Sequence, residues 1–244
     1  MRRALLLLVV LAAFVASCES KYKDPDPQVM GYDYYPLEVG QYRVYNVMDI
    51  RFSNNIGDTN RFQLRERVDT SFHDQTGQLV YKVIRSIRPN DKNEWLDDSV
   101  LIVNKTERML LTTKDNTKYV KMVFPVSRNK KWEMDAFNSR VVIDSIARLY
   151  VIKQQYVYDN VGEPFVINGT EFSNTVTVKP EVPIIVGRLD DRREVYSRNI
   201  GLVYRIYNKV TYCELANRND CPKYEEWRDV GHERHEILIE HGKL

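Results

Sequence analysis

Apolar and polar side chains alternate along the stretch Gln41-Tyr-Arg-Val-Tyr-Asn-Val-Met-Asp-Ile-Arg-Phe52. The apolar side chains of one parity are Tyr42, Val44, Met48, Ile50 and Phe52, and the charged ones of the other are Arg43, Asp49 and Arg51. A period of two is typical of a β-strand with one buried and one solvated face. We therefore expect the apolar set to face the core and the charged set to face water.

The same scheme continues outward from this stretch. In the next run, Phe62, Leu64, Val68 and Phe72 share one parity, and the side chains between them are mostly charged. Further strand-like runs are Leu79–Arg88, Trp95–Asn104, Met109–Thr113, Lys118–Val126, Arg140–Tyr158, Phe165–Ile185, Glu194–Ser197, Leu202–Tyr212 and His235–His241. The charged cluster Asp190–Arg193 indicates a solvated connection.

No segment of ten residues has a convincing helical period, and the 16 tyrosines suit a pleated, half-buried surface. About a dozen strands in one sheet must curl or split. We predict an all-β fold with a single domain over residues 34–244, built as a strongly curved antiparallel sheet or an open β-barrel. A two-sheet β-sandwich is the alternative.

The first eighteen residues predict export and lipidation. Arg2 and Arg3 precede an apolar run from Ala4 to Ala16, which is followed by Ser17 and Cys18. This order is typical of a secretory signal, and a branched residue followed by two small ones before a cysteine is a lipobox. We interpret residues 1–17 as a signal peptide and Cys18 as a lipidated N-terminus that anchors the protein to a membrane. The alternatives are a plain secretory signal and a membrane-spanning anchor, for which the run is short of the required length of about 20 residues.

The segment between the anchor and the first strand predicts a flexible tether over residues 18–33, because it is charged and carries two prolines. The full sequence has 36 Lys and Arg against 34 Asp and Glu, so loss of Arg2 and Arg3 leaves 34 of each. A nucleic-acid-binding protein is expected to carry a basic excess or stripe. We therefore expect no nucleic-acid partner.

The two remaining cysteines, Cys213 and Cys221, lie in a polar loop with turn-forming residues. In an oxidising compartment such a pair most simply forms a disulfide, and closing so short a loop contributes at most about 3 kcal/mol. A metal or redox pair is the alternative, although the spacing is not that of a CxxC motif.

Two stretches resemble a known family. Tyr34-Tyr-Pro-Leu-Glu-Val-Gly-Gln-Tyr-Arg-Val-Tyr45 resembles the opening that follows the tether in many small lipoproteins of the Bacteroidetes cell envelope. Glu194-Val-Tyr-Ser-Arg-Asn-Ile-Gly-Leu-Val-Tyr204 resembles a later strand pair of the same proteins. The resemblance implies an outer-membrane or surface lipoprotein of antiparallel β architecture, and tight backbone positions at Gly40 and Gly201. It implies no activity, and the membrane face stays open.

The same resemblance raises the question of glycosylation. Asp98-Ser-Val100 and Asp144-Ser-Ile146 are similar to O-glycosylation sites of those bacteria. Ser99 and Ser145 are therefore candidate acceptors.

No arrangement of residues predicts catalysis. His232, His235 and His241 do not form an HExxH motif, and on one strand the last two lie about 20 Å apart. Ser127-Arg-Asn-Lys130 matches SxxK but lacks the partner motifs of that mechanism. The adjacent acidic pairs Asp97-Asp98, Asp190-Asp191 and Glu225-Glu226 point to opposite faces of a strand. We predict no catalytic residues, no metal site and no cofactor.

Three functions remain as hypotheses. The first is a non-enzymatic, lipid-anchored envelope protein that binds a partner protein or an apolar ligand. The second is an envelope glycan hydrolase, whose two carboxyl groups only the fold would bring together. The third is a carrier of lipid or lipoprotein, suggested by the curved sheet.

Overall fold

Antiparallel strands make up most of the computed structural model, which describes residues 26–138, 142–143, 150–151, 154–182, 184–213 and 226–244. The strands are β1 (Gln41–Ser53), β2 (Ile56–His73), β3 (Leu79–Arg88), β4 (Leu96–Lys105), β5 (Met109–Lys114), β6 (Thr117–Val123), β7 (Lys131–Glu133), β8 (Val142–Ile143), β9 (Tyr150–Val151), β10 (Gln155–Ile167), β11 (Thr170–Pro180), β12 (Arg188–Ser197), β13 (Gly201–Tyr212) and β14 (Arg228–Lys243). Two short helices precede them, α2 (Pro27–Met30) and the 3-10 helix η1 (Tyr32–Tyr34).

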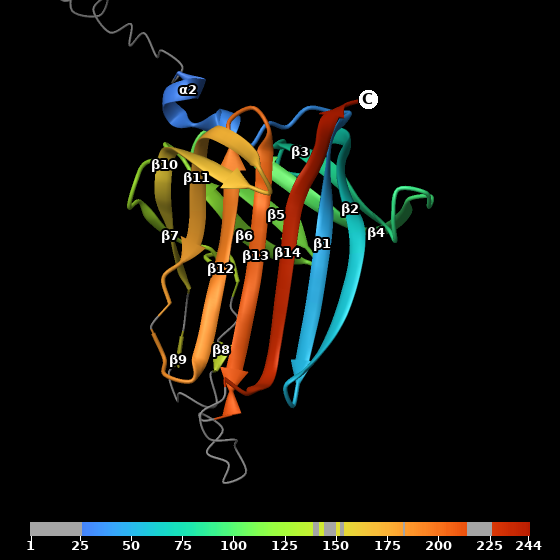
Figure 1. The fold of residues 1–244 in the computed structure, drawn as a ribbon. Coiled ribbons are helices and arrows are strands. Elements are labelled where there is room, and N and C mark those ends of the chain that lie inside the picture. The colour runs from blue at the N-terminus through green and yellow to red at the C-terminus, as the bar shows by residue number, and fades with distance from the viewer. Residues whose placement is uncertain (1–25, 139–141, 144–149, 152–153, 183, 214–225) are drawn as a thin grey trace, which may run out of the picture.

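Twelve of these strands form one sheet, in the order β6-β5-β4-β3-β2-β1-β14-β13-β12-β11-β10-β7. Most neighbours are consecutive in the chain and are joined by tight turns. The exception that joins the two halves is the pairing of β1 with β14, which runs from Gln41↔Lys243 to Ser53↔Val230. The sheet curls into a barrel (Figure 1). The predicted all-β, strongly curved antiparallel architecture is confirmed.

The two end strands of the sheet, β6 and β7, meet and nearly close the barrel. The Val120 N–H donates to the Met134 carbonyl at 2.8 Å, and the Trp132 indole N–H donates back to the Val120 carbonyl at 2.9 Å. The Tyr158 hydroxyl, from β10, accepts from the Val123 N–H at 2.8 Å and donates to the Val123 carbonyl at 2.9 Å. Side chains thus complete the pairing where the β6–β7 backbone ladder is short.

The core lies inside the barrel, and one face of β1 differs from the prediction. Tyr45 and Val47 belong to the main apolar cluster together with Leu64 of β2. They share their face of β1 with Arg43, which is 4% exposed. The side chains that share their parity with Arg43 therefore point into the barrel, and the predicted inward face of β1 is wrong. Val44, of the predicted buried set, is nevertheless only 3% exposed. On β2 the predicted inward face is confirmed at Leu64.

Arg43 is buried because the fold supplies acceptors for its guanidinium. It donates to the Ile200 carbonyl at 2.5 Å and to the Pro36 carbonyl at 3.1 Å. A Cβ atom on Gly201, whose φ is +96°, would lie 2.6 Å from the Arg43 Nε atom. The predicted tight backbone position at Gly201 is confirmed, because the guanidinium occupies the space of a side chain.

The charged cluster Asp190–Arg193 is part of β12, so the predicted solvated connection there is wrong. Arg192 donates to Asp190 at 2.5 and 2.9 Å and to Gln154 at 3.0 Å. Side chains two apart on a strand share a face, so charges that look like a loop in the sequence pair with one another along the strand.

A second apolar cluster joins the hairpin of β10 and β11 to β12, β13 and β14 on the outer face. Figure 1 shows the hairpin end crossing over β12 and β13. The ring of Phe165, near the hairpin end, stacks on Tyr204 of β13 with ring centres 5.6 Å apart. The hairpin covers this side of the barrel with its own apolar side chains.

The second half of the predicted tether belongs to the folded domain. Asp26 caps α2 by accepting from the Gln28 N–H at 2.9 Å, and Met30 and Tyr32 pack against the main core. Asp33 receives two hydrogen bonds of 2.7 Å from Arg198. The domain thus begins before Tyr34, and the tether prediction now concerns residues 18–25, outside the described part. Among the described residues, no helix has the length and apolar character needed to cross a bilayer.

Candidate ligand-binding cavity

A hollow opens inside the barrel where β2 extends past its neighbour. β3 pairs with β2 only over residues 63–73, although β2 begins at Ile56. The cavity at this overhang has a volume of about 660 Å³ and is lined from β2, β3, β4, β5, β13 and β14. Its apolar wall includes Phe62, Leu64 and Ile87. The volume falls within the range of about 300–1,000 Å³ that small-molecule sites occupy.

A smaller hollow of about 290 Å³ lies against the apolar core and shares Arg85, Lys114 and Arg205 with the larger one. Tyr35, Tyr196 and Leu202 line it and also belong to the core cluster. The two hollows therefore adjoin along a wall of cationic side chains.

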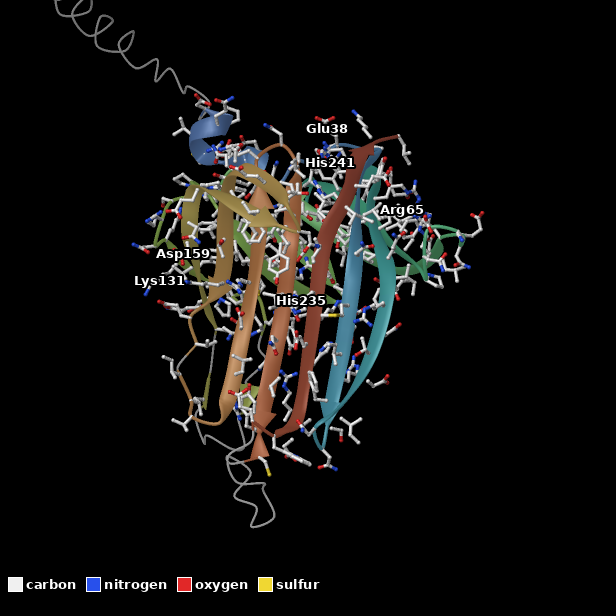
Figure 2. The ribbon with its side chains drawn as sticks, viewed as in Figure 1. Glu38, Arg65, Lys131, Asp159, His235 and His241 are labelled. Atoms are coloured by element: carbon white, nitrogen blue, oxygen red, sulfur yellow. The ribbon has the colours of Figure 1, made fainter. Side chains whose placement is uncertain are left out.

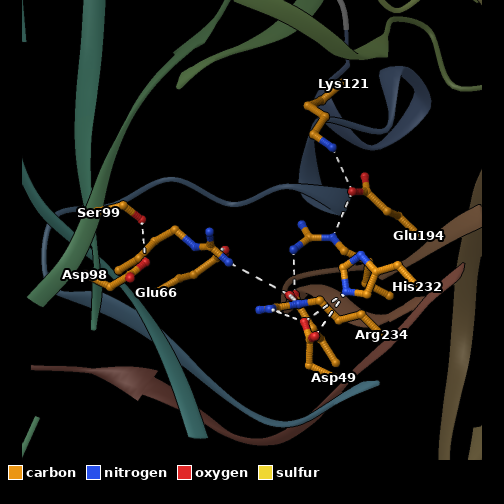
Figure 3. Close-up of polar contacts among 11 residues, drawn as sticks. Asp49, Glu66, Asp98, Ser99, Lys121, Glu194, His232 and Arg234 are labelled. Carbon is orange, nitrogen blue, oxygen red and sulfur yellow. Dashed lines mark hydrogen bonds and ion pairs between the residues drawn. The ribbon is translucent and has the colours of Figure 1, made fainter. Parts of the chain in front are cut away.

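Ion pairs connect the charged residues of this wall into a chain. Lys121 binds Glu194 at 2.7 Å, and Glu194 also receives Arg205 at 2.9 Å. Arg205 reaches Glu236 at 2.5 Å, which Arg234 also binds at 2.8 Å. Figure 3 follows this chain across strands that are far apart in the sequence.

The chain continues on β1. Arg234 binds Asp49 at 3.0 Å, and the His232 ring nitrogen lies 3.1 Å from the same carboxylate (Figure 3). The sequence pattern had placed Asp49 in solvent. In the structure it is the end of an internal charged network.

The network keeps its carboxyl groups ionised. Burial alone would raise the pKa of Glu194, but Lys121 and Arg205 outweigh it and hold that pKa well below its ordinary value. Burial likewise opposes ionisation of Glu236, yet Arg205, Arg234 and Arg85 lower its pKa. The carboxylates in turn raise the pKa of Arg205 against the effect of burial. These groups therefore stay charged at neutral pH and fix one another's positions.

Three hydrogen-bond donors of the wall lack a hydrogen-bond acceptor among the described residues. The Arg85 Nε atom lies 3.3 Å from Glu66 but, in the described part of the chain, has no hydrogen-bond partner of adequate geometry. Neither Lys114 nor the Tyr35 hydroxyl has a side-chain hydrogen bond or ion pair to another described residue. Burial raises the pKa of Tyr35 to about 12, so its hydroxyl keeps its proton.

The histidines that the sequence singled out do not converge. His232 is part of the charged network. The Nδ1 atom of His235 instead forms a hydrogen bond of 3.0 Å with the hydroxyl of Tyr204, which belongs to the second apolar cluster. Figure 2 shows His241 nearer than His235 to the C-terminal end of β14. In the described residues, no three His, Cys, Asp or Glu side chains gather as metal ligands do.

Of the other candidate residues, Asp98 lines the larger cavity, and the rest lie outside it or outside the described part of the chain. Lys130 of the SxxK match donates to the Pro125 carbonyl at 3.0 Å, away from the cavity lining. Asp97 receives the Ser86 hydroxyl at 2.8 Å, and Asp98 receives that of Ser99 at 2.9 Å. Ser99 pairs with Arg85 in the middle of β4, and its glycosylation stays a prediction.

Four of the residues named in the sequence predictions lie outside the described part of the chain: Cys18, Ser145, Cys221 and Glu225. Cys213, by contrast, is described at the end of β13 and is 3% exposed. Lipidation at Cys18 and a disulfide between Cys213 and Cys221 remain predictions.

Sequence reasoning missed the charged network itself. One sequence feature does indicate the network: a charged residue that lies, in an alternating strand, on the same face as the apolar residues. Glu66 shares its parity with Leu64 and Val68 and is only 5% exposed. A carboxylate at such a position needs a cation from another strand, but the pattern of one strand does not say which.

Comparison with known proteins adds one likeness. No family model matches the chain, and no curated protein matches it. A solved structure described as "a putative lipoprotein from Parabacteroides distasonis" is similar over 86% of this chain and 98% of that chain, with 9% sequence identity and a TM-score of 0.38. A similarity of that size has no bearing on the function.

Proposed function

We propose that this protein is an outer-membrane lipoprotein of the cell envelope, anchored at Cys18, whose barrel binds a small ligand without transforming it. The lipobox pattern Val15-Ala16-Ser17-Cys18 supports the anchor, and the resemblance of the Tyr34–Tyr45 stretch to envelope lipoproteins supports the location. The observation that carries the binding function is the cavity of about 660 Å³ inside the barrel.

The charged wall supports binding because it is preorganised. Glu194 and Glu236 are each bound by two cations, so the side chains that face the cavity are fixed before a ligand arrives. Preorganised groups lose less conformational entropy on binding. The barrel thus presents a defined surface rather than a flexible one.

The same wall favours binding over glycan hydrolysis. A glycosidase needs one carboxyl group that carries a proton near neutral pH, which requires a raised pKa. The pKa values of Glu194 and Glu236 are lowered instead, because arginine and lysine side chains bind them. Their arrangement is that of an ion-pair network.

The anchor is tested in cells of the source organism with a clickable palmitate analogue. We expect the wild-type chain to be labelled and to sediment with the outer membrane, and the Cys18→Ala variant to carry no label. Ser17→Ala, which keeps a small residue before the cysteine, is the matched control and should be labelled normally. Persistent labelling of Cys18→Ala would rule out this anchor.

Ligand binding is tested on the full-length protein purified from its own membrane, with co-purified small molecules identified by mass spectrometry. Ile87→Trp fills the cavity and should remove a bound molecule. Leu79→Trp, at an exposed position of the same strand outside the cavity lining, should keep it. A molecule retained equally by both variants would show that the cavity is not the site.

A further inference from the structure

The lining of the two hollows carries an excess of positive charge. The larger hollow has six Arg and Lys side chains and two acids among its lining residues, and the smaller one adds Lys121, Glu66 and Glu194. Even when Asp49 is counted with them, seven cations face five carboxylates. The lining of the two hollows is therefore net cationic, although the chain as a whole is close to neutral.

The cationic side chains of the lining differ in how many ion pairs they already form with carboxylates of the protein. Arg205 binds two carboxylates, Arg234 binds two, and Lys121 is paired with Glu194. These side chains have little capacity left for a ligand. Their role is to hold the wall together.

Arg85 and Lys114 keep most of their capacity. Arg85 has only the contacts of 3.3 Å to Glu66 and 3.9 Å to Glu236, and its Nε atom has no hydrogen-bond partner in the described structure. The side chain of Lys114 makes no ion pair to a described residue. Both side chains line both hollows, so an acidic group placed between the hollows meets two donors that make no hydrogen bond to a described residue.

Apolar side chains line the same space. Phe62, Leu64 and Ile87 face the larger hollow beside Arg85. A free inorganic anion would leave these side chains without a contact. A wholly apolar molecule would leave Arg85 without a hydrogen-bond acceptor in a partly buried place, which is costly.

We propose that the cavity binds an organic anion, a molecule with an apolar body against Phe62 and Ile87 and an acidic group bound by Arg85 and Lys114. This inference rests on the proposed function, because it assumes that the barrel interior is a binding site. A carboxylate, a sulfonate and a phosphate share the required chemistry, and charge-assisted hydrogen bonds to arginine and lysine are among the strong ones in proteins.

The test uses four probes with one common body: 4-butylbenzoate, 4-butylbenzenesulfonate, 4-butylphenyl phosphate and the neutral 4-butylbenzamide. Binding to the purified full-length protein is measured by isothermal titration calorimetry. We expect at least one anion to bind at least tenfold more tightly than the amide. The anion that binds best identifies the acidic group. Higher salt should weaken the anions but not the amide.

The variant Lys114→Gln removes one cation of the lining without breaking an ion pair to a described residue. It should weaken the binding of the anion roughly ten- to a hundredfold and leave the amide unchanged. Lys118→Gln, an exposed lysine of neighbouring β6 outside the cavity lining, is the matched control and should bind like the wild type. Arg85→Gln is a second variant, with circular dichroism as its check on folding.

The outcomes separate this inference from the function on which it rests. If the anions and the amide bind with equal affinity and the Ile87→Trp variant binds neither, the inference of an anionic ligand is overturned. The proposal that the barrel binds a ligand would then stand. An anion affinity unaffected by Lys114→Gln and by folded Arg85→Gln would also overturn it. No binding of any probe, together with no co-purified molecule, would overturn both.

Discussion

The Glu236 side chain is 2% exposed and lies near three arginines, Arg205, Arg234 and Arg85, at 2.5, 2.8 and 3.9 Å. Burial of a carboxylate is expensive unless cations and hydrogen bonds compensate for the lost water. Three arginines from β3, β13 and β14 meet that condition only when the strands are in register. Glu236 therefore links correct strand pairing to the electrostatics of the cavity.

We expect Glu236→Gln to destabilise the protein by about 3–5 kcal/mol, because it leaves buried arginines without their shared counter-ion. Urea denaturation of the wild type and the variant measures the change. Glu240→Gln is the matched control on the same strand: its side chain is exposed and, among the described residues, accepts a hydrogen bond only from Tyr42, so the loss should stay below about 1 kcal/mol. Equal stability of the two variants would contradict the role of the network.

The lowered pKa of Glu194 predicts a loss of stability in acid. The folded protein keeps this carboxyl group ionised to a lower pH than the unfolded chain does, so the unfolded chain binds more protons below about pH 5. Its contribution is complete above that pH and decreases as the pH falls, with a slope of up to about 1.4 kcal/mol per pH unit.

We expect Glu194→Gln to flatten the decrease in unfolding free energy between pH 5 and pH 3, as measured by urea titrations across that range. Glu171→Gln, at an exposed position of β11, should leave the slope of the wild type unchanged. A Glu194→Gln slope as steep as that of Glu171→Gln would show that other groups control the acid response.

Arg43 and Asp49 show what one strand's sequence leaves undecided. Their partners, the Ile200 carbonyl and Arg234, lie 157 and 185 positions away in the chain. Sequence reasoning assigns charged side chains to water because an unpaired buried charge is unfavourable. The fold supplies the missing partners, so the face of β1 and the cavity wall follow only from the strand order.

At the scale of the element, strands were predictable where the pattern had clear turn residues at both ends. The predicted run Leu79–Arg88 has the bounds of β3, because the Asp74–Gly77 turn and Pro89 limit it. Asp190–Arg193 was not predictable as strand, since its charges pair across two positions in β12. Period-two apolarity finds strands whose face is apolar and misses those whose face is ionic.

The junction of β6 with β7 depends on single side chains. The Tyr158 hydroxyl is bonded to both backbone groups of Val123, and the Tyr158 ring packs on Trp132 with centres 4.5 Å apart. Burial and the resulting loss of solvation raise the pKa of Tyr158, so the hydroxyl remains a donor. Across this junction the described residues share one backbone hydrogen bond, from the Val120 N–H to the Met134 carbonyl.

We expect Tyr158→Phe to destabilise the protein by about 1–3 kcal/mol, because the partly buried Val123 N–H loses its acceptor, and to accelerate hydrogen exchange at the Val123 amide. Tyr156→Phe is the matched control on the same strand, since its hydroxyl makes no hydrogen bond to another described residue. Exchange at Val123 that is the same in both variants would mean that Tyr158 does not maintain the junction.

At the scale of the whole molecule, the curled antiparallel sheet was predictable from the number of strands, because a flat sheet of that size is unfavourable. The pairing that joins the two halves of the sheet was not. β1 and β14 meet although the Tyr42 hydroxyl and its acceptor Glu240 are 198 positions apart, and neither strand carries a local signal for the other. The cavity is lined from both halves of the sheet, so the sequence alone did not reveal it.

The path of the chain places α2 and the C-terminus at the same end of the barrel, and the turn at Asn54 and Asn55 at the opposite end (Figure 1). The Leu244 N–H even donates to the Gly40 carbonyl, just before β1, at 3.0 Å. An epitope tag fused after Leu244 would therefore sit at the end of the barrel where α2 lies. A tag inserted between Asn54 and Asn55 would project from the opposite end, well separated from α2 and from the C-terminus.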